Sequence, residues 1–172
     1  MTLKKCILSF VFLLGGCVGM PDGVTPVDNF QLERYLGTWY EIARLDHSFE
    51  RGLSHVTADY SMNPDGSVRV INRGYSSAEN KWKQAKGKAR FVKKTDEGFL
   101  KVSFFGPFYG SYVIFELDRG NYSHALVCGP DRSYLWLLAR NPVISQELKN
   151  ALVAKAASRG FETENLIWVR HD

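Results

Sequence analysis

The stretch Leu36-Gly37-Thr38-Trp39-Tyr40-Glu41-Ile42 begins the regular part of this chain of 172 residues. Gly37 allows the backbone to turn or to pass close to another segment. Trp39, two residues later, brings a large apolar surface into whatever lies beneath it. A Gly-x-Trp pair is a weak signal by itself, so its meaning depends on the elements that follow it.

The segments after this stretch are short, rich in β-branched and aromatic residues, and separated by turn signals, which predicts an all-β fold. Strands are expected at 38–45, 53–62, from Val68 onward, and at 82–92, 99–105, 111–117, 122–128 and 133–139. Eight strands at this spacing predict an antiparallel up-and-down β-barrel, because closure of the meander removes its unpaired edges. An eight-stranded barrel has room inside for one small ligand.

The hydrophobic period changes after Pro142. Apolar residues recur at helical spacing over 144–156, Ser145 suits the N-cap, and Gly160 follows the last turn. This pattern predicts one C-terminal α-helix packed outside the barrel, followed by a short final strand at 166–169.

The N-terminus is typical of a targeting segment and not of a folded domain. Lys4 and Lys5 precede an apolar run over 6–14 that is too short to span a membrane. The run ends in Leu14-Gly15-Gly16-Cys17, which resembles a bacterial lipobox. Residues 1–16 are therefore expected to be a lipoprotein signal peptide and Cys17 the acylated residue. An ordinary secretory signal with an incidental cysteine is the alternative.

The region behind this signal divides into a linker and one domain. Residues 17–29 contain two prolines and two glycines and are expected to form a lipidated tether. Residues 30–36 could form a single helical turn or a loop lid. The remaining chain has no repeat and no composition break, so a single domain is expected over 30–172.

Charge and cysteine content limit the classes of function. Removal of Lys4 and Lys5 lowers the formal net charge from +4 to +2, so the basic pI is a poor argument for a nucleic-acid partner. Of three cysteines, Cys6 is removed and Cys17 carries lipid, which leaves Cys128 without an intrachain disulfide partner. Cys128 is expected to behave as a small buried hydrophobe.

Three motifs resemble the lipocalin family: Gly37-Thr38-Trp39 at the first strand, Asp118-Arg119 before the seventh, and Arg140 ending the eighth. Segments at 40–44, 46–53, 101–110 and 128–131 look like those of bacterial lipocalins, so the resemblance covers residues 30–170. It implies an outer-membrane lipoprotein that holds a fatty acid or lysophospholipid, for storage or transport in envelope maintenance or stress. It also implies no catalytic residue, cofactor or metal, and it allows a homodimer. Val18 after the acylated cysteine agrees with outer-membrane sorting, with the domain facing the periplasm.

The topology of a meander assigns these motifs to one end of the barrel. The start of the first strand and the end of the eighth fall at the same rim, so Gly37, Trp39 and Arg140 are expected to close the barrel. The resemblance implies that the arginine lies across the tryptophan ring, which is a cation–π contact. Both residues are therefore expected to be structural.

The loops at 46–52, 76–80, 105–110 and 129–133 fall at the opposite rim, which is the expected mouth. The loop with Phe105, Phe108 and Tyr109 is unusually aromatic for a solvent-facing loop. Exposed apolar patches mark partner or membrane contacts, but these rings could instead fold inward as a lid.

Strand alternation selects the residues expected to line the pocket. If Trp39 points inward, so do Glu41 and Ala43. If Arg140 points at Trp39, residues of the same parity on the eighth strand line the interior, and the sixth strand adds two more: Leu138, Trp136, Tyr134, Tyr112 and Ile114. Such a lining suits an acyl chain with its polar head near the mouth. A buried Glu41 must be paired or protonated, and a tyrosine or Arg140 is its expected partner.

Two other classes of function compete with lipid binding. An enzyme would use the densest polar group, Asp46, His47, Glu50 and His55, but their spacing matches no metal or nucleophile motif, and a solvated loop explains them. An interaction protein would use the aromatic loop or the barrel wall to dimerise or to dock to envelope partners. A filled barrel interior would favour the latter over a lipid carrier.

Overall fold

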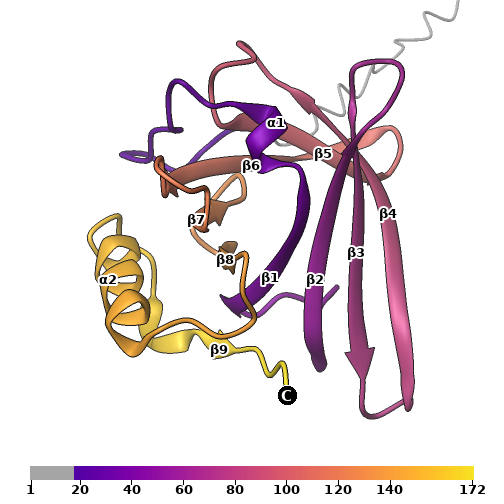
Figure 1. Ribbon diagram of the computed structural model, residues 1–172, viewed down its shortest axis with the longest axis vertical. Helices are drawn as coiled ribbons and strands as arrows, with labels where there is room; N and C mark the ends of the chain where they lie inside the picture. The colour runs from indigo at the N-terminus through magenta and orange to yellow at the C-terminus, as the bar shows by residue number, and fades with distance from the viewer. Residues whose placement is uncertain (1–17) are drawn as a thin grey trace, which may run out of the picture.

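The computed structural model describes residues 18–172, in which one continuous sheet curls around a central space and a helix packs beside it (Figure 1). The predicted signal peptide and the lipidation of Cys17 lie outside the described residues. The elements in chain order are α1 (Leu32–Tyr35), β1 (Gly37–Arg44), β2 (Leu53–Met62), β3 (Val68–Ser76), β4 (Lys81–Phe91), β5 (Phe99–Phe105), β6 (Phe108–Leu117), β7 (His124–Cys128), β8 (Leu135–Ala139), α2 (Gln146–Ala157), the 3₁₀ turn η1 (Thr163–Asn165) and β9 (Ile167–Trp168).

Strands β1 to β8 form the predicted closed antiparallel barrel. Each strand pairs with the next, and β1 closes the barrel by pairing with both β2 and β8. The short strand β9 adds to the other end of β1, where Ala43 is opposite Trp168. The all-β prediction, the eight strands and the final strand are therefore confirmed.

A β-bulge in β1 changes which side chains face the barrel interior. Glu41 is opposite Leu138 but Ala43 is opposite Leu137, so Ile42 is an extra residue in β1. A bulge of this kind reverses the alternation of side chains beyond it. Ile42 and Ala43 are consequently both buried in the outer layer of the protein. The prediction that Ala43 points inward is therefore wrong.

The outer layer lies between the barrel wall and α2. It includes Ala43, Leu137, Leu152 and Ala156, all buried. The helix begins as predicted after Ser145, whose hydroxyl accepts a hydrogen bond from the Leu148 N–H at 3.2 Å. Each fully buried aliphatic side chain contributes about 1.5–3 kcal/mol to folding, so this layer fixes α2 on the barrel.

The segment expected to be a tether is instead packed on the barrel. Val24 and Val27 are buried. The Val27 N–H donates to the carbonyl of Ile114 at 2.9 Å, and the Gly98 N–H donates to the carbonyl of Val27 at 2.8 Å. Closer to the N-terminus, the carbonyl of Asp22 accepts a hydrogen bond from Arg132 at 2.5 Å. The chain is thus held against the barrel well before residue 30.

Strands β2, β3 and β4 extend farther than the rest of the barrel wall (Figure 1). Strand β4 pairs with β3 from Lys81 to Ala89, but it pairs with β5 only from Lys88 to Phe91. Residues 81–87 therefore form a free strand edge on the mouth side. The helices within residues 18–172 are too short or too polar to span a bilayer.

Candidate functional site

The barrel encloses a cavity of about 680 Å³, which is within the usual size range of a ligand pocket. Its walls are mainly aliphatic and aromatic, with Val56, Val70, Leu100, Val102, Phe104, Trp136 and Leu138 among them. Its mouth lies among loop residues that include Phe49, Phe105, Phe108, Pro130 and Tyr134. The cavity can therefore accept a long apolar chain from one end.

Five of the seven residues predicted to line the pocket do line this cavity: Glu41, Tyr112, Tyr134, Trp136 and Leu138. Ile114 points into the barrel core but is fully buried beyond the cavity, among the side chains that fill the closed end. Ala43 lies outside the barrel wall because of the bulge at Ile42.

Trp39 and Arg140 meet at the closed end of the barrel. The Arg140 guanidinium carbon lies 4.1 Å from the centroid of the fully buried Trp39 ring. The same guanidinium donates hydrogen bonds to the carbonyls of Thr38, Arg34 and Leu36 at 2.8–2.9 Å. Gly37 has a positive φ of 90°, and a Cβ there would lie 3.5 Å from the guanidinium. This arrangement fills the end of the barrel and leaves no opening for a ligand there.

Three tyrosine hydroxyls form the floor of the cavity above this closed end. The Tyr112 hydroxyl lies 2.8 Å from that of Tyr35 and 2.7 Å from that of Tyr60. Burial raises the pKa of all three phenols well above the ordinary value, so they stay neutral. Tyr112 was expected in the pocket, whereas Tyr35 and Tyr60 were not. The alternation of β2 carried the signal for Tyr60, since Val56, Ala58 and Tyr60 share one face.

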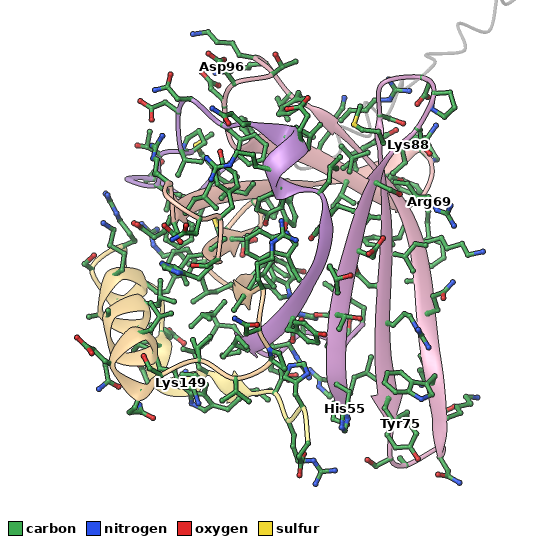
Figure 2. The ribbon with its side chains drawn as sticks, viewed as in Figure 1. His55, Arg69, Tyr75, Lys88, Asp96 and Lys149 are labelled. Carbon is green, nitrogen blue, oxygen red and sulfur yellow. The ribbon has the colours of Figure 1, made fainter. Side chains whose placement is uncertain are left out.

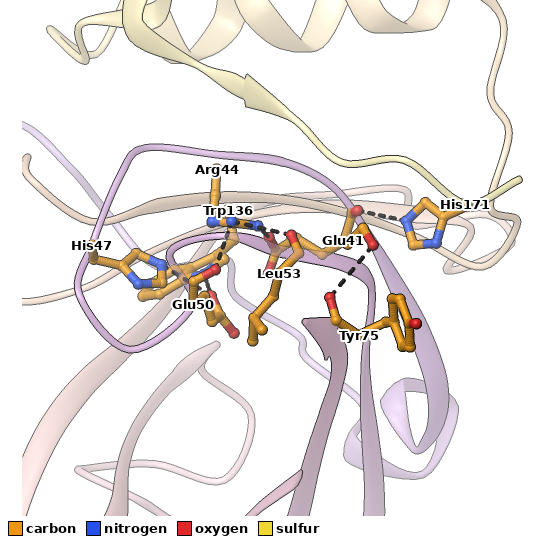
Figure 3. A network of polar contacts seen from close by, with 9 residues as sticks. Glu41, Arg44, His47, Glu50, Leu53, Tyr75, Trp136 and His171 are labelled. Carbon is orange, nitrogen blue, oxygen red and sulfur yellow. Dashed lines mark hydrogen bonds and ion pairs between the residues drawn. The ribbon is translucent and has the colours of Figure 1, made fainter. Parts of the chain in front are cut away.

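Glu41 pairs with Arg44, and not with a tyrosine or Arg140 as expected. The Arg44 guanidinium, which is buried, donates to the Glu41 carboxylate at 2.6 Å and to the backbone carbonyl of Glu50 at 2.8 Å (Figure 3). The bulge at Ile42 explains this pairing, because it returns residue 44 to the side of the strand that Glu41 occupies. Arg44 thus ties β1 to the loop that follows it.

Glu50 brings a second buried carboxylate to the same cluster. Its Oε2 accepts a hydrogen bond from the Trp136 indole N–H at 3.0 Å and lies 3.0 Å from His47 Nε2 (Figure 3). Burial opposes its charge, but His47 and Trp136 outweigh burial and lower the Glu50 pKa. Burial and the nearby Glu50 charge raise the pKa of Glu41 well above its usual range, against the effect of Arg44. The cavity wall thus carries two neighbouring carboxyl groups whose pKa values are shifted in opposite directions.

A family model described as a lipocalin-like domain matches residues 30–171. The chain belongs to the lipocalin family. It is 58% identical over 158 residues to Outer membrane lipoprotein Blc of Vibrio cholerae, covering 92% of each chain. It is 57% identical over 150 residues to Outer membrane lipoprotein Blc of Escherichia coli K12, covering 87% of this chain and 84% of that one. The predicted resemblance to bacterial lipocalins is therefore confirmed.

Solved structures agree on the fold of this lipocalin. Insecticyanin from the tobacco hornworm Manduca sexta superposes with a TM-score of 0.71 at 21% identity, covering 90% of this chain and 87% of that one. The cockroach allergen Per a 4 superposes with a TM-score of 0.68 at 17% identity, covering 88% and 94%. At these identities the likeness concerns the architecture.

Of the four polar residues weighed as a catalytic group, His47 and Glu50 come together in this lipocalin, and Asp46 and His55 lie apart from them. His47 and Glu50 are buried in the loop, which corrects the expectation that the loop is solvated. Asp46 pairs outside them with Arg51 at 2.7 Å. His55 lies near the start of β2 beside Tyr75 (Figure 2), where its ring contacts the backbone carbonyl of Asp172. The four residues therefore face three different surroundings.

The remaining reactive groups are also accounted for by packing. Cys128 is fully buried, and burial raises the pKa of its thiol to about 12, so it is not a nucleophilic thiolate near neutral pH. Within residues 18–172, no group of three or more His, Cys, Asp or Glu side chains is placed to hold a metal ion.

The rings of the predicted mouth loop project outward at the tip of the β5–β6 hairpin. Phe105 is 83% exposed and Phe108 is 60% exposed, so neither closes the cavity as a lid. Tyr109 is half-buried, with Lys101 Nζ 5.0 Å from its ring centroid. Of the two alternatives left open by the sequence, the structure shows the exposed one.

Proposed function

We propose that this lipocalin is a lipid-anchored envelope protein that holds the acyl chain of a fatty acid or lysophospholipid in its barrel cavity. The observation that carries the proposal is the apolar cavity of about 680 Å³, open at one end and closed at the other by Trp39 and Arg140. An acyl chain buries its methylene groups against such walls, and each contributes about 0.8 kcal/mol of binding free energy.

The names of the bacterial relatives support the anchor and the location. The proteins from Vibrio cholerae and Escherichia coli are both called outer membrane lipoproteins. We propose the same location for this chain, with acylation at Cys17 and the barrel in the periplasm. Expressed with an ordinary cleavable signal in place of residues 1–17, the anchor-free protein is expected in the soluble periplasmic fraction. Its continued sedimentation with outer membranes would contradict the role of Cys17.

Lipid binding is tested on the same anchor-free protein. Organic extraction followed by mass spectrometry should identify co-purified fatty acids or lysophospholipids. Titration with either lipid should quench tryptophan fluorescence to saturation, because Trp136 lines the cavity. An unchanged emission and an empty extract would count against a carrier. Any turnover of the bound lipid would instead indicate an enzyme.

A second role, contact with the membrane surface, is favoured by the exposed rings at the β5–β6 tip. Phe105 and Phe108 are opposite each other in the register of β5 and β6, and both rings are exposed. The Gly19 N–H donates to the Ser111 hydroxyl on β6 at 2.9 Å, so the chain leaves the barrel along the strand that carries Phe108. We propose that the acyl groups on Cys17 and these two rings meet the same bilayer. Homodimerisation through the rings is the competing outcome.

A further inference from the structure

The three hydroxyls on the cavity floor have one more donor than their own contacts can use. Tyr112 contacts both Tyr35 and Tyr60, which gives two hydrogen bonds among three O–H groups. Each hydroxyl has one donor and two acceptor lone pairs, so one donor is left over whichever way the two bonds run. Among residues 18–172, no other side chain or carbonyl accepts from these hydroxyls.

The surplus donor can be satisfied only from the cavity. All three tyrosines line it, while the neighbouring wall is formed by Val70, Leu100 and other apolar side chains. A buried donor without a partner is energetically costly. A ligand that places a methyl group against the floor would leave this donor unpaired, whereas one that places an oxygen there would satisfy it.

The charge at the closed end favours the same kind of atom. The Tyr35 ring packs on Trp39 with centroids 4.6 Å apart, and Arg140 lies over the same indole ring. Burial is the main influence on the Tyr35 pKa and raises it, while the positive charge of Arg140 acts in the opposite direction. A positive charge beneath the floor stabilises an electron-rich oxygen above it.

We propose that the Tyr35–Tyr112–Tyr60 chain is a binding subsite for an acceptor oxygen at the buried end of an acyl ligand. The inference rests on the proposed lipid binding and narrows its ligand. Two ligand groups could supply an acceptor oxygen at this position. One is the carboxyl group of a fatty acid that enters head-first, and the other is a terminal hydroxyl on the acyl chain.

The test compares chains that differ only at their buried end. The probes are palmitoyl-lysophosphatidylcholine and its ω-hydroxypalmitoyl counterpart, titrated into the anchor-free protein by calorimetry. The large head group keeps both lipids chain-first. One hydrogen bond should make the hydroxylated lipid bind about 3–10-fold more tightly. Equal affinities would overturn the subsite and leave the proposed function standing, whereas binding of neither lipid nor of palmitate would overturn the proposed function.

Substitution of the floor tyrosines should change the preference between the two lipids, which a purely structural role of these residues would not do. The triple variant Tyr35→Phe, Tyr60→Phe, Tyr112→Phe should lose the preference but still bind the plain palmitoyl lipid. A preference that persists in the triple variant would contradict the proposal. If the triple variant does not fold, the comparison of the two lipids on the wild type still decides.

Two further measurements complete the test. Tyr122→Phe is the matched control, since its hydroxyl accepts from the Gln31 N–H at 3.0 Å at the same end of the barrel but does not line the cavity. The Tyr122→Phe variant should keep the preference for the hydroxylated lipid. Loss of that preference in this variant would contradict the subsite. Palmitate identifies the source of the oxygen: weaker binding to the triple variant indicates carboxyl-first entry, and unchanged binding indicates the terminal hydroxyl.

Discussion

The closed end and the mouth of the barrel each depend on an arginine, but the two arginines have different partners. At the closed end, Arg140 donates to backbone carbonyls and lies over the Trp39 ring, all of which are neutral. Near the mouth, Arg44 donates to the Glu41 carboxylate as well as to loop carbonyls. Neutral partners do not titrate, whereas carboxylates do. The closed end should therefore hold over a wide pH range, and the mouth should respond to pH.

Of the substitutions that test this difference, replacement of Arg44 should lower the free energy of unfolding the most. Arg44→Met leaves the buried Glu41 carboxyl group and the carbonyls of Glu50 and Leu53 without their donor. Because a hydrogen bond to a charged group contributes about 1.5–3 kcal/mol, the free energy of unfolding should fall by about 3–5 kcal/mol. Urea denaturation followed by circular dichroism measures this loss. The control is Arg51→Met, because Arg51 pairs with Asp46 on the surface and its replacement should cost far less stability than that of Arg44. Equal losses in the two variants would show that the Arg44 cluster does not stabilise the loop.

Replacement of Arg140 should have the next largest effect. Arg140→Met removes the cation–π contact and the charged donors to the Thr38 and Leu36 carbonyls, which water can partly replace at this end. The free energy of unfolding should fall by about 2–3 kcal/mol. Arg119→Met is the matched control, since Arg119 pairs with the exposed Asp28 and should cost less than about 1 kcal/mol. A neutral Arg140→Met variant would mean that packing of Trp39 alone closes the barrel.

Glu41 and Glu50, the two buried carboxyl groups beside Arg44, should contribute to stability with opposite pH dependence. The Glu50 pKa is lowered on folding, so its contribution is present above its ordinary value of 4.5 and is lost as the pH falls. Glu50→Gln should therefore cost about 1.5–3 kcal/mol near neutral pH and less in acid. The Glu41 pKa is raised, so its contribution is present below 4.5 and is lost as the pH rises. Glu41→Gln resembles the neutral form and should cost less than about 1 kcal/mol.

Urea denaturation at about pH 4 and about pH 7 separates these cases. The loss caused by Arg140→Met should be the same at both pH values, because its partners do not titrate. A loss for Glu50→Gln that is equally independent of pH would remove the distinction between the two ends.

The barrel itself could be predicted from the sequence because each strand carries its own local signal. Alternation and turn residues placed β2, β5 and the last strand within a residue or two of their observed bounds. The Trp39–Arg140 contact could be predicted because a meander brings the two strand ends to one rim. Each of these predictions needs only periodicity and topology.

The polar cluster could not be predicted, because it depends on one residue of register. The bulge at Ile42 is set by how β1 pairs with β8, and a run of apolar residues such as Ile42 and Ala43 fits either face. The bulge moves Ala43 out of the barrel and brings Arg44 to Glu41. Burial of His47 and Glu50 then follows from contacts with Trp136, a residue 86 positions away from Glu50. Alternation within one strand carries no information about either event.

The exposed rings at the mouth should give the smallest effect on stability and a separate effect on membranes. Phe105→Ser with Phe108→Ser removes side chains that are 83% and 60% exposed, so the free energy of unfolding should change by less than about 0.5 kcal/mol. Co-sedimentation of the anchor-free protein with phospholipid vesicles should nevertheless fall, because aromatic rings partition into the membrane interface. Val143→Ser is the matched control, since Val143 is 78% exposed but precedes α2, away from the β5–β6 tip. Vesicle binding that is unchanged, together with a loss of dimers in ultracentrifugation, would assign the rings to contact between copies of the protein. In that case the exposed rings would distinguish the mouth from the closed end as a surface for binding a second copy of the protein, and not as a surface for binding the membrane.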